Sequence, residues 1–122
     1  MNIGIDLGGT KIQVGIEHEG KIIHKTKALL KEKNDLQSTL NQVMQFIKPL
    51  TAHEVEGIGI GVPSVVDVEK GIVYNVTNIP SWKKVALKDI LEQEFNLPVF
   101  VNNDVNCFAI GEHKFGKGKS YS

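Results

Sequence analysis

Six consecutive residues near the start of the chain, Asp6-Leu7-Gly8-Gly9-Thr10-Lys11, have the composition of a phosphate-binding turn. Glycines let the backbone curl closely around an anion and offer it bare N–H groups, and Thr10 and Lys11 add further donors. The carboxylate of Asp6 would repel phosphate unless a cation lay between them. The stretch therefore predicts a site for a phosphate chain and a divalent metal. An ordinary hairpin with polar neighbours is the alternative, because short glycine motifs also match by chance.

Asp104 is the strongest candidate for a catalytic base. It follows residues 99–101, an apolar run typical of a buried strand, and we expect it in the first turn of a helix with Asn103 as the N-cap. The positive end of a helix favours an ionised carboxylate, which can take a proton from a substrate hydroxyl. The alternative is that Asp104 only caps the helix, since first-turn aspartates are common.

A second group of polar residues has the chemistry of a carbohydrate site, where amides match vicinal hydroxyls and an aromatic ring forms a wall. Its members are Ser64, Asn75, Asn78, Trp82, Asn102 and Asn103. For an asparagine near proline or glycine the alternative is a role in a turn. That alternative is stronger for Asn75 than for Asn78 or Asn103.

The four histidines, His18, His24, His53 and His113, lie far apart in the sequence, and no two have the spacing of metal ligands. The single cysteine, Cys107, cannot form a disulfide within the chain, which fits a reducing compartment. Its apolar helical surroundings predict an inert core residue rather than a nucleophile. The pattern therefore predicts no zinc site.

Length and charge exclude several classes of protein. The 122 residues are enough for one compact domain, and 41% hydrophobic and 23% charged residues are ordinary values for a globular protein. Fourteen basic residues balance fourteen acidic ones, so no global field attracts nucleic acid or an anionic membrane. We expect neither partner. With no signal peptide and no long apolar run, we expect a cytoplasmic location.

The hydrophobic pattern predicts the order of the elements. Strict alternation indicates three strands, Asn2–Leu7, 11–17 and 21–27, joined by tight turns into an antiparallel meander. Helical spacing follows from Leu36 to Ile47. We then expect strands at 56–62, 65–68, 72–74 and 99–101, a loop at 75–83, and helices at 85–95 and from Val105 to Phe115.

The position of the candidate residues follows from this order. Strands linked through helices are expected to be parallel, and ligands of such sheets bind beyond the carboxyl ends of the strands. Residues 6–11, 61–64 and 102–104 all lie at such ends. We therefore expect them to converge on one edge of the sheet.

Four motifs in this order resemble the ROK family of sugar kinases, within the actin-like ATPase superfamily. They are Asp6-Leu7-Gly8-Gly9-Thr10-Lys11, Gly59-Ile60-Gly61-Val62-Pro63-Ser64-Val65-Val66-Asp67, Asn78-Ile79-Pro80-Ser81-Trp82 and Asn102-Asn103-Asp104-Val105-Asn106-Cys107. The resemblance covers essentially the whole chain, and four motifs in this order are more specific than any one of them. The resemblance implies an α/β, ribonuclease H-like domain. Its mixed sheet would have three antiparallel N-terminal strands and later parallel strands flanked by helices.

The resemblance also implies an activity, the transfer of the γ-phosphate of ATP to a hydroxyl of a hexose or an N-acetylhexosamine, as in glucokinases. Asp104 would be the base, and Asp6 would position Mg²⁺ through water. The implied sugar ligands are Ser64, Asn78, Asn103 and Asp104, and the implied ATP-phosphate ligands are Gly8, Gly9, Thr10 and Lys11. Two residues depart from the family pattern: Ser64 stands where glycine is usual, and Asn102 where glutamate is common.

The family's second lobe carries another glycine-rich loop, a Glu-x-Gly-His segment and a cysteine-rich zinc motif, and none of these occurs in the 122 residues. We therefore expect residues 1–115 to form an N-terminal lobe and residues 116–122 a hinge-like tail toward the absent lobe. Such a chain is expected to be inactive alone and able to form a homo-oligomer. The alternatives are a sugar-sensing transcriptional regulator, since the family includes repressors, and a non-catalytic sugar-binding domain.

Overall fold

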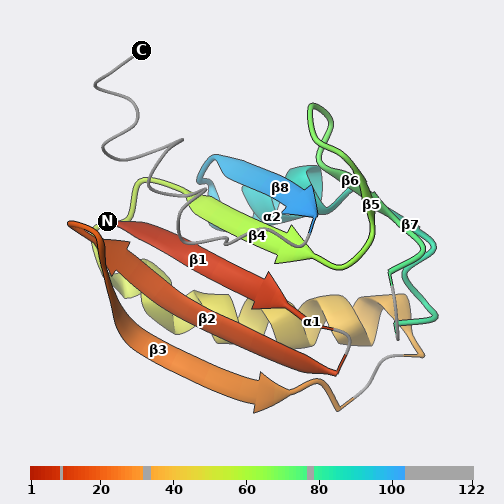
Figure 1. Cartoon of the computed structure of the whole chain (residues 1–122), viewed down its shortest axis with the longest axis horizontal. Helices are drawn as coiled ribbons and strands as arrows, with labels where there is room; N and C mark the ends of the chain where they lie inside the picture. Colours follow the sequence, from red (N-terminus) through yellow and green to blue (C-terminus); the bar gives the residue numbers. More distant parts are fainter. Residues whose placement is uncertain (9, 32–33, 77–78, 104–122) are drawn as a thin grey trace.

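The computed structural model describes residues 1–8, 10–31, 34–76 and 79–103, which form two β-sheets packed with helices (Figure 1). The main sheet has five strands in the order β3-β2-β1-β4-β8. Their bounds are Asn2–Leu7 for β1, Lys11–His18 for β2, Lys21–Leu29 for β3, Ile58–Val62 for β4 and Val99–Asn103 for β8. The small sheet consists of β5 (Val65–Asp67), β6 (Ile72–Tyr74) and β7 (Lys84–Val85).

Strand direction in the main sheet follows the length of the connections. β1–β2 and β2–β3 are antiparallel because short turns join them. Glu19 and Gly20 form the second turn with φ of 52° and 78°, the left-handed pair that a two-residue hairpin needs. β1–β4 and β4–β8 are parallel, with helices in their connections. The predicted mixed sheet is confirmed.

Helix α1 (Leu36–Ile47) has the predicted bounds and begins after the N-cap residue Asp35. The Asp35 carboxylate accepts a hydrogen bond from the Ser38 N–H at 2.9 Å, which satisfies one of the free donors of the first turn. A 3-10 helix, η1 (Lys48–Ala52), follows directly with a proline in its first turn. The buried face of α1 consists of Thr39, Leu40, Val43 and Ile47.

Helix α2 (Leu87–Phe95) starts two residues later than predicted because Lys84 and Val85 pair with β6 as strand β7. It ends where expected, at Asn96, whose left-handed backbone (φ 55°) lets its N–H bond the Glu92 carbonyl oxygen at 2.9 Å. The Glu92 carboxylate also accepts the N–H of Val99 at 3.0 Å. This bond fixes the end of α2 to the beginning of β8.

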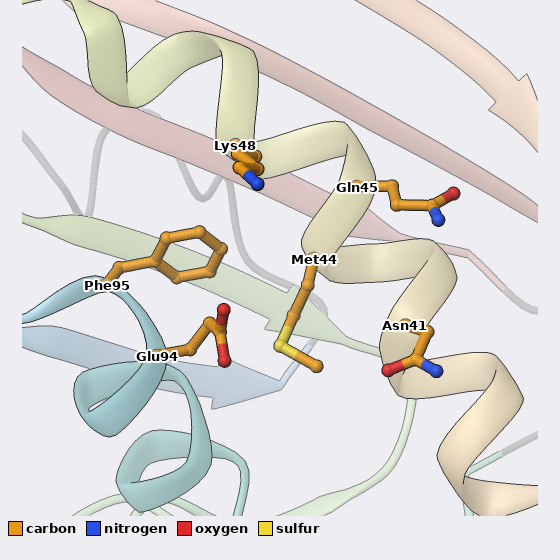
Figure 2. A pocket seen from close by; sticks show the side chains of 6 residues that line it. All are labelled: Asn41, Met44, Gln45, Lys48, Glu94 and Phe95. Carbon is orange, nitrogen blue, oxygen red and sulfur yellow. The ribbon is translucent and has the colours of Figure 1, made fainter.

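Both α-helices lie on the same face of the main sheet, behind it in Figure 1 and side by side in Figure 2. The two faces of the sheet differ sharply in composition. Paired positions form apolar rows such as Ile3, Ile16, Ile58 and Val99 on one face, whereas Gly4 pairs with Gly15 and Gly59 on the other. The apolar rows are fully or almost fully buried and form most of the core.

Several boundaries differ from the predictions. β3 continues to Leu29, and β4 begins only at Ile58. β8 continues two residues further than predicted, so Asn102 and Asn103 are its last residues, and the role of Asn103 as an N-cap stays a prediction because the helix expected after it lies outside the described residues. The predicted last helix and the tail 116–122 lie outside the described residues.

Candidate functional site

A row of polar side chains crosses the main sheet near the carboxyl ends of β1, β4 and β8. Asp6 of β1 pairs with Gln13 of β2 on one side and with Gly61 of β4 on the other. Gln13 in turn pairs with Lys27 of β3, and Gly61 pairs with Asn102 of β8. Residues paired across neighbouring strands point to the same face. The pairing therefore places one cation, one carboxylate and two amides in a single line on one face.

Asp6 and Asn102 face each other across a gap in this row. Neighbouring strands lie about 4.8 Å apart, so the two residues are separated by about 10 Å. Gly61 lies between them and has no side chain to fill the space. Asp6 is also the one exposed residue of β1, whose other five residues are buried. A carboxylate and an amide thus flank a position that has no side chain, although the backbone of Gly61 is itself buried.

The donor set at Asp6 fits a hard divalent cation. Mg²⁺ in phosphate-binding enzymes is typically held by one or two carboxylates and the substrate phosphates, and it keeps several waters. An exposed carboxylate next to a side-chain-free position meets that requirement.

The turn that follows β1 is held tightly on both sides. The Gly8 N–H donates to the Lys11 carbonyl oxygen at 2.8 Å, and the Thr10 carbonyl oxygen accepts the Leu30 N–H at 2.9 Å. A Cβ on Gly8 would approach the Lys11 carbonyl oxygen to 3.3 Å, so the tight turn favours glycine there. Thr10 and Lys11 are both exposed. Gly9 lies outside the described residues.

The residues predicted to bind sugar approach the same edge from β4 and β8. Val62, the last residue of β4, pairs with Asn103, and the Ser64 N–H donates to the Val62 carbonyl oxygen at 3.0 Å. Asn103 is exposed, and its N–H bonds the Asn102 side-chain oxygen at 2.8 Å. Ser64, Asn103 and Asp6 thus lie at the same end of the sheet, but Asn103 pairs with the buried Val62 and so lies on the face opposite Asp6 and Asn102. Asn78 and Asp104 lie outside the described residues, and their roles stay predictions.

Trp82 does not form the open aromatic wall that the sequence suggests. Its side chain is fully buried in the core, and its Nε1–H has no hydrogen-bond partner among the described residues. Its backbone instead forms two hydrogen bonds to residues that precede it. The Val76 N–H donates to the Trp82 carbonyl oxygen at 3.0 Å, and the Trp82 N–H donates to the Ile79 carbonyl oxygen at 2.9 Å. Asn75 has a left-handed backbone (φ 48°), in agreement with a role in a turn. Trp82 therefore fixes the backbone of Val76 and Ile79 to the core.

Two pockets in the described part of the chain differ in the residues that line them. One pocket of about 200 Å³ is lined by Lys11, Lys27, Ala28 and Leu29. Lys11 belongs to the predicted phosphate-binding turn of residues 6–11, called the phosphate turn below, so positive charge borders this turn. The other, of about 230 Å³, lies between α1 and α2, with Met44 and Lys48 on one side and Glu94 and Phe95 on the other (Figure 2). It lies near the amino ends of the strands that follow these helices, away from the polar row.

Gln13 and Lys27 are the site residues that sequence reasoning missed. The alternation within residues 11–17 places Gln13 on a polar face, which is the one available signal. Only the pairing with Asp6 shows that this is the face of the candidate site. Lys27 joins the row because of the register between β2 and β3, which the sequence does not specify.

Comparison with known proteins places these features in a family. The model of the ROK family matches residues 2–122. A glucokinase of Thermotoga maritima is 36% identical over 121 residues, which are 98% of this chain and 38% of the glucokinase. A xylose repressor of Caldicellulosiruptor bescii is also 36% identical, over 94% of this chain and 30% of the repressor.

A solved structure has the same fold as this chain. It is a ROK family glucokinase from Streptomyces griseus in complex with glucose and AMPPNP, with a TM-score of 0.75 and 36% sequence identity. The likeness covers 96% of this chain and 37% of that one. The chain thus spans less than two fifths of the length of each of these three proteins. None of the helices in the described ranges is long and apolar enough to cross a membrane.

Proposed function

Because the chain belongs to the ROK family, we propose that it supplies the N-terminal lobe of an ATP-dependent sugar kinase. The reaction is transfer of the γ-phosphoryl group of ATP to a hydroxyl of a hexose or an N-acetylhexosamine. The observation that carries this proposal is the register of Asp6, Gly61 and Asn102, which places a carboxylate and an amide on either side of a position without a side chain, one residue before β1 ends. We further propose that the parent protein works in the cytoplasm, where ATP is available.

The residues of the phosphate turn have the task of binding and orienting the nucleotide. Phosphoryl transfer depends mainly on positioning and on neutralising charge that develops on the phosphate oxygens. Bound Mg²⁺ would supply neutralisation between the phosphates and Asp6. Thr10 and Lys11, exposed beside the rigid turn, add a hydroxyl and an ammonium to the backbone donors. Lys27, in the same polar row, extends the positive surface.

The sugar is proposed to bind on the β4–β8 side of the row. Ser64 and the exposed Asn103 can bind its hydroxyls, and Asn78 completes the set in this hypothesis. Asp104 directly follows β8 and is proposed to accept the proton of the attacking hydroxyl. Residues at the ends of strands hold their positions better than residues in free loops, so the base and the phosphates can be kept in line.

The first experiment is a kinetic comparison in the full-length parent protein. Asp104→Asn keeps the shape of the side chain but cannot accept the proton, so we expect kcat to fall by about 10²–10⁴-fold with little change in sugar binding. Asp89→Asn, on the exposed side of α2, is the matched control and should leave kcat unchanged. Near-normal turnover of Asp104→Asn would instead assign Asp104 to helix capping.

The second experiment concerns the 122 residues alone. Enzymes of this kind bind the nucleotide between two lobes, and closure excludes water and completes the site. A single lobe offers few phosphate contacts, which scarcely offset the loss of ligand freedom on binding. We therefore expect no sugar-dependent ADP release from this chain with Mg²⁺. Sedimentation would test self-association in parallel, and robust turnover by a monomer would refute the one-lobe assignment.

A sugar-sensing regulator is the second candidate, and the similarity to a xylose repressor favours it. The two functions share a sugar site but differ in turnover. A kinase releases ADP when sugar is present, whereas a regulator binds sugar without consuming ATP and changes its affinity for DNA. Measuring both activities in the parent protein separates the two functions.

A further inference from the structure

Two histidines that are distant in the sequence are in contact in the fold. The ring centroids of His24 and His53 lie 4.6 Å apart, and the ring planes are tilted by 33°. His24 belongs to the edge strand β3, and His53 is the residue that ends η1. The spacing of the histidines along the chain does not indicate this contact, because it depends on how η1 packs relative to the edge of the sheet.

The backbone of His24 has an unusual conformation for a residue inside a strand. Its φ of 53° lies in the left-handed region, which residues with a Cβ adopt rarely and at some cost in energy. Close to this point the pairing of β2 with β3 shifts register, between Val14 and Ile16. Irregularities of this kind change the direction in which a side chain points, and they occur frequently at functional sites. The strain at His24 accompanies the contact of its ring with His53.

We propose that His24 and His53 together bind one divalent transition-metal ion, such as Zn²⁺, Ni²⁺ or Cu²⁺. Neutral imidazole is a preferred ligand of these ions. Two nitrogens bound to one ion at about 2.0–2.1 Å lie at most about 4 Å apart, a separation that rings in contact can reach by small rotations. This inference goes beyond the proposed kinase function and does not depend on it.

The surroundings of the pair determine what kind of site this is. His24 is exposed and His53 is half-buried, so an ion can reach the rings from solvent. Within the described ranges no cluster of three or more histidine, cysteine or carboxylate side chains forms a metal site. Water therefore completes the coordination sphere, and the ion is exchangeable. Mg²⁺ is a poor competitor because it prefers oxygen ligands.

The bound ion would join two parts of the fold that the backbone does not connect directly. β3 is at the edge of the sheet and has only β2 as a neighbour, whereas η1 follows α1 in the helical layer. A ligand that binds only the folded chain stabilises it by mass action. Metal binding should therefore raise the melting temperature of the chain.

The test uses purified protein in which Cys107→Ser and His113→Gln remove other soft ligands. In that background we compare His24→Asn, His53→Gln and the control His18→Gln. Asparagine tolerates the left-handed backbone, so His24→Asn should fold normally. His18 is exposed and lies on β2 outside the pair. Calorimetric titration with Zn²⁺ measures affinity and stoichiometry, and electron paramagnetic resonance with Cu²⁺ counts the nitrogen ligands.

We expect one ion per chain, two nitrogen ligands for Cu²⁺ and a metal-dependent rise in melting temperature. Each variant of the pair should weaken binding by more than about 10-fold and lose one nitrogen ligand, while His18→Gln should change neither property. Excess Mg²⁺ should not displace the ion. Absence of saturable binding, or equal affinity in His24→Asn, His53→Gln and His18→Gln, would overturn the proposal.

Discussion

Gly71 is the position where a single added methyl group should damage the fold most. It lies in the turn between β5 and β6 with a left-handed φ of 67°. Its N–H donates to the Asp67 carbonyl oxygen at 2.7 Å, and its carbonyl oxygen accepts the Lys88 N–H at 3.1 Å in the first turn of α2. A Cβ at this position would lie 2.1 Å from the Cβ of Lys88. That atom is attached to the helix backbone and cannot rotate away.

The expected destabilisation in Gly71→Ala has two parts. A left-handed backbone costs alanine about 1–2 kcal/mol, partly offset by the lower entropy of the unfolded alanine chain, worth about 0.4–1 kcal/mol. The clash also forces the turn away from α2 and breaks the bond to Lys88, which contributes about 1 kcal/mol before any loss of packing. We expect a total of about 2–4 kcal/mol.

Gly20→Ala is the matched control for the backbone part. Gly20 has a similar φ of 78°, but a Cβ there would have no atom within 4 Å. This substitution should therefore cost about 1 kcal/mol or less. The difference in free energy of unfolding between the two variants measures the effect of the contact with Lys88. The cost of the left-handed backbone is common to both variants and cancels.

Urea unfolding followed by tryptophan fluorescence is the assay. Trp82 is the single tryptophan and is fully buried, so its emission should shift to longer wavelength when the chain unfolds. The midpoint and slope of each curve yield the free energy of unfolding. If Gly71→Ala and Gly20→Ala lower it equally, the close approach of the turn to α2 does not contribute, and the reasoning fails.

Three further predictions concern hydrogen bonds. Glu17→Gln should lower the free energy of unfolding by about 0.5–3 kcal/mol in urea unfolding. The Glu17 carboxylate accepts hydrogen bonds from Asn2 Nδ2 at 3.4 Å and from the Gly20 N–H at 3.1 Å, and glutamine keeps only one side-chain oxygen to accept them; unchanged stability would contradict this. Hydrogen bonds from the Ser38 hydroxyl and then its N–H lower the pKa of Asp35 below 3.8. This contribution to stability is thus present above pH 3.8 and is lost as the pH falls through the lowered pKa. Acid titrations of Asp35→Asn should show a smaller loss, and an unchanged profile would refute the assignment. Glu92→Ala should cost about 1–3 kcal/mol by removing the acceptor of the first N–H of β8, whereas Glu92→Gln should cost less; equal losses would show that the acceptor is unimportant.

Much of the architecture could be predicted from local pattern. Strict alternation located β1 and β2 to within one residue, and the helical spacing from Leu36 to Ile47 matched α1 at both ends. Short turns and helical connections then determined which strand pairs are antiparallel and which are parallel. These features follow from the sequence because a segment with one buried face has apolar residues at every second position if it is a strand and at every third or fourth position if it is a helix.

Local pattern was less reliable where residues serve a distant partner. Val85 looks like the first residue of the helix predicted at 85–95, but together with Lys84 it pairs with β6, and a two-residue strand has no periodicity of its own. Trp82 has the aromatic ring that often forms the wall of a sugar site, yet its side chain is fully buried in the core. The sequence near Trp82 cannot show which apolar residues will cover it.

The candidate site shows the same division. The sequence alone predicted a site at Asp6 and the turn after it. Two glycines followed by a hydroxyl and an ammonium are suitable donors to phosphate, and the preceding carboxylate is suitable for a cation. It also matched four family motifs across the chain. Only the tertiary structure decided that Asp6 shares a row with Gln13 and Asn102, and that His24 touches His53. Register and long-range contacts depend on the packing of the whole sheet, and a shift by one residue would turn each side chain to the other face.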